Sequence, residues 1–293
     1  MNISDISKER MHRKENLMIN VLFAGNDKVF DGVLTASLSV VKRLDEPRPL
    51  TIHIFTMDIT RINPKYTPMQ EYHRAFIEKS LREYNPETYV ILYDVTDTYE
   101  RELHENANES CYCSPYTLLR LLADLYDMPD KLLYLDCDVM LCKDISLLYD
   151  IDVSECEYAA TTDHYGKFFI HPRYINAGVL LFNMKKCRET GLFSKARELI
   201  KVKKLLFADQ SAIIRSTTMK KHISQRYNDQ KFLYKNTVIR HFSKRLFYLP
   251  YPHTDNVKQW QIERVHKIFG YRCFDDIYDE FLELKNTAKE PSK

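Results

Sequence analysis

Residues 131–138 read Lys-Leu-Leu-Tyr-Leu-Asp-Cys-Asp, a short apolar run that ends in the carboxylates Asp136 and Asp138. The run is too short for a typical helix and is typical of a strand buried on both faces, as in a parallel sheet. Residues two apart on a strand point the same way, so both carboxylates would face one side. Because ligands of open α/β sheets bind outside the carboxyl ends of the strands, this stretch predicts an α/β fold with a binding site at its end.

Two carboxylates at a strand end are hard oxygen ligands that suit Mg²⁺ or Mn²⁺, with a phosphate group completing the coordination shell. A phosphate-linked substrate is therefore the leading hypothesis from this stretch. Two other interpretations stay open at this point: a polar strand end that leads into a turn, and the nucleophile pair of a phosphatase. Such phosphatases usually carry the pair near the start of the domain with Thr or Val two residues after it, whereas Met140 stands there in this chain.

The composition is that of an ordinary globular protein, with 44% hydrophobic and 29% charged residues in a chain of 293. Lys and Arg number 43 and Asp and Glu number 41, so the chain lacks the basic field of a nucleic-acid binder. The 7 cysteines are scattered without the spacing of a disulfide framework, which indicates a reducing compartment. The first residues lack the apolar core of a signal peptide, and no stretch approaches the ~20 apolar residues of a membrane span, so we expect a cytoplasmic protein.

Segments with strand and helix patterns alternate along the chain, which predicts βαβ units and a mostly parallel sheet. Strands are expected at 18–24, 50–57, 88–95, 131–135, 157–162 and 177–182, and helices at 28–44, 69–84, from Ser114 onward, at 185–202 and at 209–215. Ser114 is a good N-cap for its helix, and Pro115 suits the first turn. From about residue 250 the pattern weakens to two short amphipathic segments, 257–269 and 274–284, which precede a polar tail.

The 6 glycines form neither a Gly-x-Gly-x-x-Gly fingerprint nor a Walker loop. Dinucleotide and P-loop sites need glycines so that the backbone can approach phosphates closely, and their absence argues against both. A bound phosphate would therefore have to be neutralised by a metal ion and side chains.

The Asp-x-Asp segment resembles the corresponding block of the retaining glycosyltransferases of family 8, which include bacterial lipopolysaccharide galactosyl- and glucosyltransferases and glycogenin. Four further blocks match in the same order, and the likeness extends over roughly residues 18–250. These blocks are Ser114–Arg120, Tyr174–Asn183, Ala208–Gln210 and Arg226–Asn228. The resemblance implies a GT-A-like Rossmann-type domain at 18–250, with a mixed, mostly parallel sheet flanked by helices, and a small helical extension and polar tail at 251–293.

The resemblance also implies a function: metal-dependent transfer of a hexose, glucose or galactose, from a UDP-sugar to a carbohydrate or glycan acceptor with retention. Asp136, Asp138 and His241 would hold Mn²⁺ or Mg²⁺. The catalytic positions that contact the transferred sugar would be Asn176, Asp209 and Gln210. The donor-binding positions would be Ala24, Gly25, Asn26, Asp27, Thr117, Arg120, Asp136, Cys137, Asp138, Asn176, Ala177 and Lys244. Since an amide is a poor nucleophile, Gln210 favours attack on the same face that the diphosphate leaves.

The chain departs from the family pattern at two places. Val29 replaces a Tyr that stacks on the nucleotide base. The family's ending His-x-x-Gly-x-x-Lys-Pro-Trp is broken, because Phe247 stands where the phosphate-binding Lys belongs. Lys244 or Arg245 would then supply the positive charge from a neighbouring position.

Two rival functions stay open. A metal-dependent phosphohydrolase would release phosphate from small phosphoesters. A degenerate glycosyltransferase fold would bind nucleotide or carbohydrate without turnover, and the broken ending keeps that alternative in play. For the transferase, a peripheral contact with the inner face of a membrane is also compatible with the sequence, although the C-terminal tail lacks a strong basic amphipathic signature.

Overall fold

The computed structural model describes residues 17–109, 114–247, 249 and 251–287. Its main sheet contains β1 (Ile19–Ala24), β2 (Leu50–Thr56), β3 (Thr88–Asp94), β4 (Lys131–Leu135), β6 (Tyr158–Thr162), β7 (Ile175–Asn183) and β8 (Lys220–His222). Two small two-stranded sheets pair β5 (Val139–Leu141) with β9 (Ile239–His241), and β10 (Arg245–Phe247) with β11 (His253–Asp255). The end of the expected polar tail lies outside the described residues.

The 7-stranded main sheet has the order β3-β2-β1-β4-β7-β6-β8 and is mostly parallel, as the alternation of patterns predicts. Strand β7 alone runs against its neighbours, pairing antiparallel with both β4 and β6. This reversal has a consequence for function, because it brings the amino end of β7 beside the carboxyl end of β4. The peptide N–H of Asp136 donates to the carbonyl of Gly178 there, at 2.8 Å.

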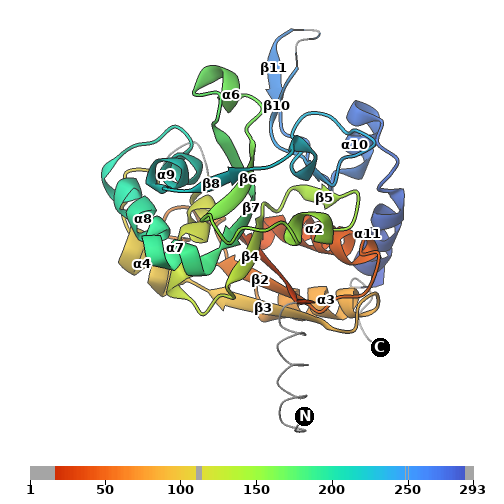
Figure 1. Ribbon diagram of the computed structural model, residues 1–293. Coiled ribbons are helices and arrows are strands. Elements are labelled where there is room, and N and C mark those ends of the chain that lie inside the picture. Colours follow the sequence, from red (N-terminus) through yellow and green to blue (C-terminus); the bar gives the residue numbers. More distant parts are fainter. Residues whose placement is uncertain (1–16, 110–113, 248, 250, 288–293) are drawn as a thin grey trace, which may run out of the picture.

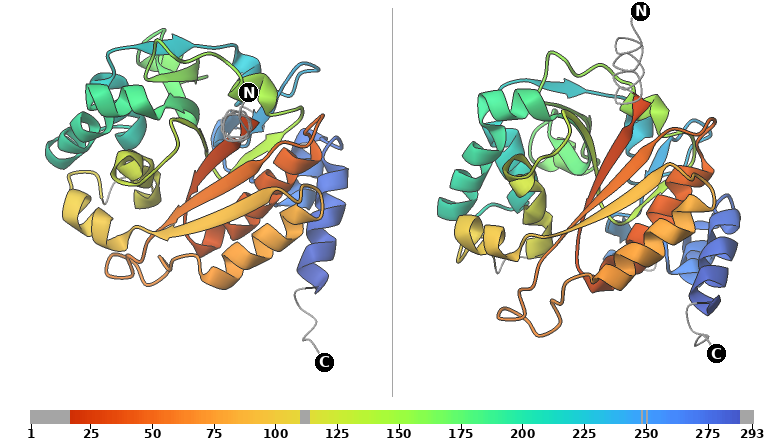
Figure 2. Two further views of the ribbon diagram at one scale, coloured as in Figure 1. Left: turned by 60° about the horizontal axis from the view of Figure 1, so that its bottom comes forward. Right: turned by 90° about the horizontal axis from the view of Figure 1, so that it is seen from below.

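Helices cover both faces of this sheet (Figures 1 and 2). The α-helices are α2 (Phe30–Lys42), α3 (Glu71–Arg82), α4 (Thr96–Leu103), α5 (Ser146–Tyr149), α6 (Gly166–Phe169), α7 (Met184–Thr190), α8 (Leu192–Val202), α9 (Ala208–Ser216), α10 (Ile262–Phe269) and α11 (Asp275–Thr287). The 3₁₀ helices are η1 (Asp27–Val29), η2 (Pro115–Leu125) and η3 (Gln225–Tyr227). Within the described part of the chain, none of the helices is both long enough and apolar enough to cross a bilayer.

Three helical details differ from the sequence prediction. The helix expected at 185–202 is two helices, because Gly191 takes the left-handed φ of 67° and ends α7. The helix that begins after Ser114 is 3₁₀ over its whole length, and the Ser114 hydroxyl accepts from the Tyr116 N–H as an N-cap should. Helix α4 was not predicted, because its β-branched start Val95-Thr96 reads as the end of a strand.

The two faces of the sheet bury separate hydrophobic clusters, and the alternation along each strand decides which side chain goes where. On β4, Leu133 and Leu135 join the cluster under α2 and α11, whereas Leu132 and Tyr134 face η2 and α8. Asp136 continues the alternation of Leu132 and Tyr134, so its side chain lies on the face of the sheet that η2 covers. The C-terminal segment joins the first cluster through buried side chains of α10 and α11, namely Val265, Ile277, Tyr278 and Phe281.

The buried His53 of β2 makes the stability of the fold depend on pH. Its ring nitrogens lie 3.1 Å from the Tyr93 hydroxyl and 3.4 Å from Asn20 Oδ1, and burial lowers its pKa to about 4. The unfolded chain, whose histidine titrates near its ordinary value, takes up this proton first as the pH falls. We therefore expect the free energy of unfolding to fall between about pH 6.5 and 4, by roughly 3 kcal/mol from this residue.

Urea unfolding of the wild type and of His53→Gln, measured from pH 7 to pH 4, tests this expectation. The variant keeps a hydrogen-bonding side chain but cannot titrate, so its stability should fall less steeply over that range. His171→Gln, at an exposed histidine, serves as the matched control and should keep the wild-type slope. Equal slopes for wild type and His53→Gln would contradict the assignment.

Candidate metal and nucleotide-sugar site

The site begins where β4 ends. Asp136 is the first residue after the strand, and its Oδ1 accepts from the Tyr134 hydroxyl at 2.9 Å and from the Arg120 guanidinium at 2.9 Å. Asp138 follows on the same side and leads into β5. His241 ends β9 and comes opposite Val139 in the β5–β9 pair. The small two-stranded sheet thus brings a residue 103 positions after Asp138 back to the carboxylates.

Asp136, Asp138 and His241 form a compact cluster whose ligand atoms lie within 4.8 Å of one another. His241 Nε2 is 3.1 Å from Asp138 Oδ1 and 3.7 Å from Asp136 Oδ2. Gly178 of β7 permits this close approach, since a Cβ there would lie 2.3 Å from His241 Cε1 and 2.6 Å from Asp136 Oδ2. The glycine of the Asn-Ala-Gly block is therefore a steric requirement of the cluster.

A chain of side-chain hydrogen bonds fixes the tautomer of His241. Asp163 Oδ2 accepts from Asn176 Nδ2 at 2.8 Å, and Asn176 Oδ1 accepts from the Gly178 N–H at 3.0 Å, which together orient this amide. Asn176 Oδ1 also accepts from Asn228 Nδ2 at 2.9 Å, so Asn228 must present its oxygen to His241 Nδ1, 3.0 Å away. In the neutral ring Nδ1 then carries the proton, and Nε2 turns a lone pair toward the carboxylates.

That arrangement fits a divalent cation. A nitrogen lone pair and two carboxylates facing one another at these distances repel unless a positive charge lies between them. Imidazole nitrogen with two carboxylate oxygens is a ligand set that suits Mn²⁺ and Mg²⁺, and the Asn228 contact is the outer support that such a histidine needs. Asp136, Asp138 and His241 would be the protein ligands.

A cation of the protein itself also reaches the cluster. The Lys258 ammonium pairs with Asp138 Oδ2. Burial alone would raise the pKa of the Asp138 carboxyl, but the positive charge of Lys258 opposes burial and helps to hold that pKa far below its usual range. The segment that carries Lys258 is anchored, because Gln259 Nε2 donates to the Cys137 carbonyl at 2.7 Å.

Arg120, on η2, is buried and joins four segments. Its guanidinium donates to Asp136 Oδ1, lies 3.2 Å from Asp209 Oδ2 and donates to the carbonyls of Thr117 and Ala177. It also stacks 3.9 Å from the centre of the Tyr134 ring. Burial raises the pKa of Asp209, and the charge of Arg120 partly opposes that rise.

Gln210 supports strand β7 from α9. Its Oε1 accepts from the Ala177 N–H at 2.9 Å. Asn176 and Ala177 begin the strand, and Asp209 and Gln210 begin the helix that packs on it, so the residues expected to contact the sugar do lie together. Each of them already has a hydrogen-bonding or ionic partner within the protein.

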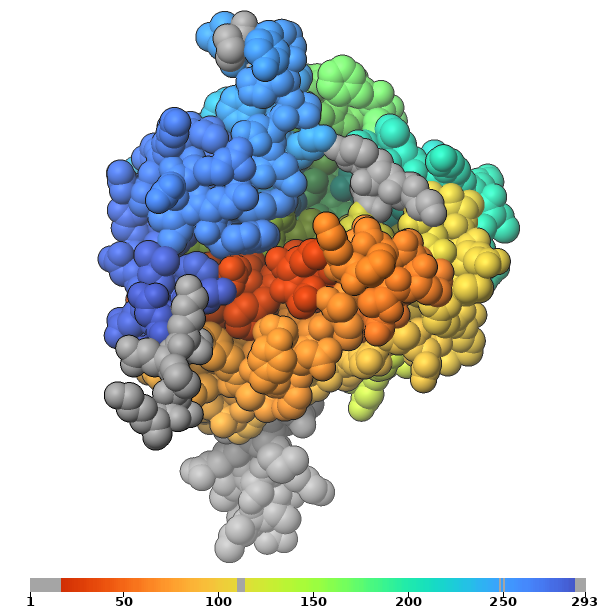
Figure 3. Space-filling view, turned by 180° about the vertical axis from the view of Figure 1, so that it is seen from behind, coloured from red at the N-terminus to blue at the C-terminus, as the bar shows by residue number. Residues whose placement is uncertain are grey.

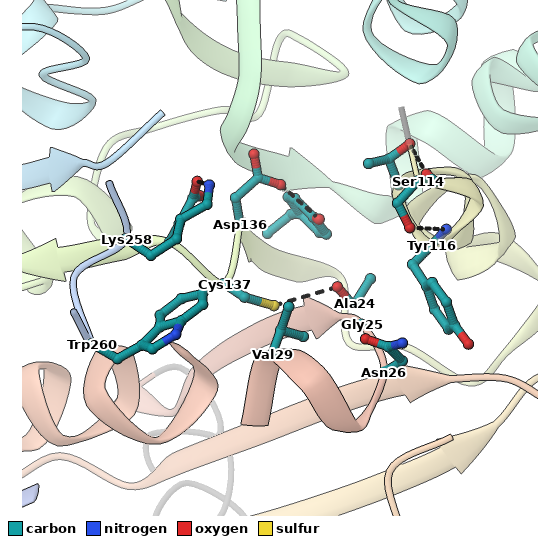
Figure 4. A pocket seen from close by; sticks show the side chains of 13 residues that line it. Ala24, Gly25, Asn26, Val29, Ser114, Tyr116, Asp136, Cys137, Lys258 and Trp260 are labelled. Atoms are coloured by element: carbon teal, nitrogen blue, oxygen red, sulfur yellow. Dashed lines mark hydrogen bonds and ion pairs between the residues drawn. The ribbon is translucent and has the colours of Figure 1, made fainter. Parts of the chain in front are cut away.

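A pocket of about 250 Å³ opens beside the cluster (Figure 4). Lys258 and Trp260 enter it from one side, and Ser114 and Tyr116 lie opposite (Figure 4). Of the expected donor-binding residues, those that line it are Ala24, Gly25, Asn26, Thr117, Asp136, Cys137 and Asp138. Its mouth is the hollow between the red and orange N-terminal elements and the blue C-terminal segment in Figure 3.

The other five expected donor-binding residues do not line the pocket. Arg120, Asn176 and Ala177 belong to the hydrogen-bond network around the cluster, and Asp27 and Lys244 lie elsewhere. Asp27 bonds to the neighbouring loop, where its Oδ2 accepts from the Thr67 hydroxyl at 2.6 Å. Lys244 is an exposed residue between β9 and β10 and does not contribute to the lining of this pocket.

Sequence reasoning missed Lys258 and Trp260, although a signal was present. Lys258-Gln259-Trp260 repeats the Lys-x-Trp of the expected ending, 11 residues after Phe247. The β10–β11 hairpin occupies the stretch between these positions and displaces the motif along the chain without removing it from the site. Asn228 was noted only as part of a matching block, and Asp163 had no signal because its role depends on a tertiary contact.

Comparison with known proteins finds glycosyltransferases. The model of the family described as glycosyl transferase family 8 matches residues 20–247. A stretch of 77 residues is 39% identical to glycosyltransferase GlyA of Streptococcus pneumoniae serotype 4, covering 25% of this chain and 11% of GlyA. A stretch of 70 residues is 30% identical to the probable glycosyl transferase Gly of Streptococcus gordonii, covering 24% of this chain and 10% of that protein. These matches span about a tenth of either relative.

Solved structures show the same fold. The bifunctional glycosyltransferase WbbM aligns with a TM-score of 0.66 and 16% identity, over 92% of this chain and 51% of WbbM. The galactosyltransferase LgtC, bound to donor and acceptor sugar analogues, aligns with a TM-score of 0.61 and 18% identity, over 94% of this chain and 98% of LgtC. GlyE of Streptococcus pneumoniae aligns with a TM-score of 0.60 and 19% identity, over 94% of this chain and 66% of GlyE. The expected GT-A-like fold is confirmed.

Removing the Arg120 charge should destabilise the protein strongly. Arg120→Met would leave Asp136 and Asp209 without their shared cation, and breaking a buried ion pair on one side costs about 3 to 5 kcal/mol. Urea unfolding at pH 7 measures the loss. Adding Asp209→Asn should restore part of the stability, since one unpaired buried carboxylate is removed. Arg101→Met, at an exposed pair with Glu102, is the control and should change stability by less than about 1 kcal/mol. Equal losses at the two arginines would contradict the prediction.

Asn228 should control the metal affinity of the cluster without being a ligand. Asn228→Ala removes the acceptor that orients His241, and losing such an outer contact typically weakens metal binding by about 10- to 100-fold. Titration with Mn²⁺, followed by electron paramagnetic resonance or calorimetry, gives the dissociation constant. Asn236→Ala, at an exposed asparagine before β9, should bind Mn²⁺ like the wild type. Wild-type affinity in Asn228→Ala would rule out this role.

Proposed function

The chain belongs to glycosyl transferase family 8, and we propose that it transfers a hexose, glucose or galactose, from a UDP-sugar to a carbohydrate or glycan acceptor with retention at the anomeric carbon. The reaction would need Mn²⁺ or Mg²⁺ and would take place in the cytoplasm. The observation that carries this proposal is the Asp136–Asp138–His241 cluster at the edge of the pocket, with the His241 lone pair directed at the two carboxylates.

The positive charges around the pocket fit a nucleoside diphosphate. A divalent ion on the three ligands would offset the charge that develops on the departing diphosphate. Lys258 supplies a second positive charge on the pocket side of Asp138, and we assign to it the phosphate-binding role that the sequence left open between Lys244 and Arg245. Trp260 lines the same pocket. The transferase domain at 18–250 would then be completed by these residues of the C-terminal extension at 251–293.

The polar residues on the other side of the cluster fit recognition of the transferred sugar. Asn176 and Asp209 are held by Asp163 and Arg120, so they are preorganised and lose little conformational freedom on binding. The Gln210 carbonyl oxygen is held by the Ala177 N–H, which turns it away from nucleophilic attack. This contact supports transfer on one face, in which the acceptor hydroxyl attacks as the diphosphate leaves and an oxygen of the diphosphate takes its proton.

The contacts of Asp136 argue against the phosphohydrolase. Its Oδ1 already accepts from both Arg120 and Tyr134, and a carboxylate held by two donors is a weak nucleophile. A degenerate fold that binds without turnover remains the alternative that an activity measurement must separate.

Binding of UDP with Mn²⁺ should raise the thermal stability of the wild type, because both ligands bind the native state. Lys258→Met should weaken UDP binding by about tenfold or more, through the loss of one charge-assisted contact, while Mn²⁺ alone still stabilises it. Lys244→Met, the matched lysine variant, should respond like the wild type, and Asp138→Asn should respond to neither ligand. A UDP response that depends on Lys244 and not on Lys258 would contradict the assignment.

A nucleotide-sugar screen with Mn²⁺ separates the candidate functions. Release of UDP that requires a UDP-hexose and yields a glycan product supports the transferase. Release of phosphate from small phosphoesters would support the phosphohydrolase instead, and binding of UDP without turnover of any donor would identify a binding module.

A further inference from the structure

Three stretches of the chain combine aromatic and basic residues and contain no acidic residue. They are 164–173, 230–236 and 242–254, in a chain that has 43 basic and 41 acidic residues in all. Their cationic residues are Lys167, Arg173, Lys231, Lys235, Lys244 and Arg245. Such segregation of charge gives this part of the protein a local positive potential that its net charge of +2 does not reveal.

These stretches lie against one another. The Tyr165 hydroxyl accepts from the Leu246 N–H at 3.2 Å, which ties the β10–β11 hairpin to the start of α6. Gln230 Oε1 accepts from the His164 N–H at 2.7 Å. The Arg245 guanidinium lies 5.8 Å from the centre of the Phe232 ring, and this contact connects stretch 242–254 to stretch 230–236. We call the surface that the described residues of these three stretches form the aromatic–basic rim, with residues 248 and 250 left out of it.

The rim carries large apolar side chains on two projecting tips. Helix α6 and the hairpin project from the same end of the molecule in Figure 1. On α6, Phe168 and Phe169 are 71% and 81% exposed, and on the hairpin Leu249 and Tyr251 are 83% and 67% exposed. Exposed apolar groups that cluster on one projecting surface are a feature of interaction sites.

The rim is connected to the metal cluster through the hydrogen-bond chain Asp163–Asn176–Asn228–His241. Asp163, whose Oδ2 holds Asn176, uses its Oδ1 to accept from the Gly166 N–H that begins α6. The hairpin is inserted between His241, a proposed metal ligand, and Lys258, a proposed phosphate ligand. A surface that bound to the rim would therefore lie beside the opening of the site.

We propose that the aromatic–basic rim docks the protein on an anionic lipid bilayer, with the tips of α6 and the hairpin in the boundary between headgroups and acyl chains. Phe, Leu and Tyr side chains on a projecting surface suit this boundary, and the surrounding Lys and Arg suit anionic headgroups. A binding platform for a soluble glycan would instead place aromatic ring faces in a concave site, whereas these side chains occupy convex tips. Docking would place the opening of the site beside the membrane surface.

Co-flotation with vesicles tests the proposal. The wild type should float with vesicles of phosphatidylcholine and phosphatidylglycerol, float much less with phosphatidylcholine alone, and dissociate as salt is raised, because headgroup attraction is screened. Phe168→Ser/Phe169→Ser and, separately, Leu249→Ser/Tyr251→Ser should each lower the partition coefficient by about tenfold, since two apolar side chains no longer leave water. Tyr72→Ser/Tyr89→Ser removes two exposed aromatic side chains from α3 and β3, at the opposite end of the molecule, and should bind like the wild type (Figure 1).

Thermal melting shows whether each variant is folded, and the response of the melting temperature to UDP with Mn²⁺ should be the same in the rim variants and the wild type. Docking and the proposed transferase function can therefore fail separately. Wild-type protein that stays with the unbound fraction, or rim variants that float as well as the wild type, would overturn the proposal. A third outcome would also overturn the proposal: the wild type does not bind vesicles, and the rim variants lose affinity for soluble oligosaccharides. That outcome would identify the rim as a glycan-binding surface.

Discussion

The buried guanidinium of Arg120 is the constraint on which the rest of the site depends. A buried charge needs ionic and hydrogen-bonding partners. Those of Arg120 are Asp136 after β4, Asp209 on α9 and the Ala177 carbonyl on β7. These segments are distant in the sequence, yet each must come to the same point to neutralise or accept from one side chain. The need to satisfy this charge therefore fixes where the carboxyl end of β4 lies relative to the helix and strand that face it.

The reversal of β7 turns that local arrangement into a metal site. If β7 ran parallel to β4, its amino end would lie at the far edge of the sheet, and the Asn-Ala-Gly sequence could not meet the carboxylates. Because it runs antiparallel, Gly178 gives its carbonyl to Asp136 and leaves room for His241. Asn176, two residues earlier, then reaches both Asp163 and Asn228. One strand direction thus accounts for the position of the ligands and for the hydrogen bonds that set the tautomer of the histidine.

Much of the fold could be predicted from the sequence because its strands are short, buried and separated by amphipathic helices. The same periodicity could not give the strand order, the reversal of β7 or the break at Gly191, since these depend on tertiary contacts and on one backbone angle. The carboxylate pair was visible because its members are two residues apart. The role of Lys258 was not visible, because the β10–β11 hairpin interrupts the expected spacing after His241. A motif that is searched for at a fixed spacing is missed when residues are inserted within it.

The two sides of the site are built differently, and this difference has a physical origin. On the side of Arg120, Asn176 and Asp209, buried charges and amides satisfy one another, so a change in any of them leaves a neighbour unpaired. On the side of Lys258, a chain segment outside the main sheet reaches Asp138, and a projecting hairpin precedes that segment. The length of the hairpin can change without disturbing the buried network around Arg120. The first side sets the chemistry that the cluster can support. The second side, together with the neighbouring rim, is where a chain of this fold can alter what it binds without rebuilding its core.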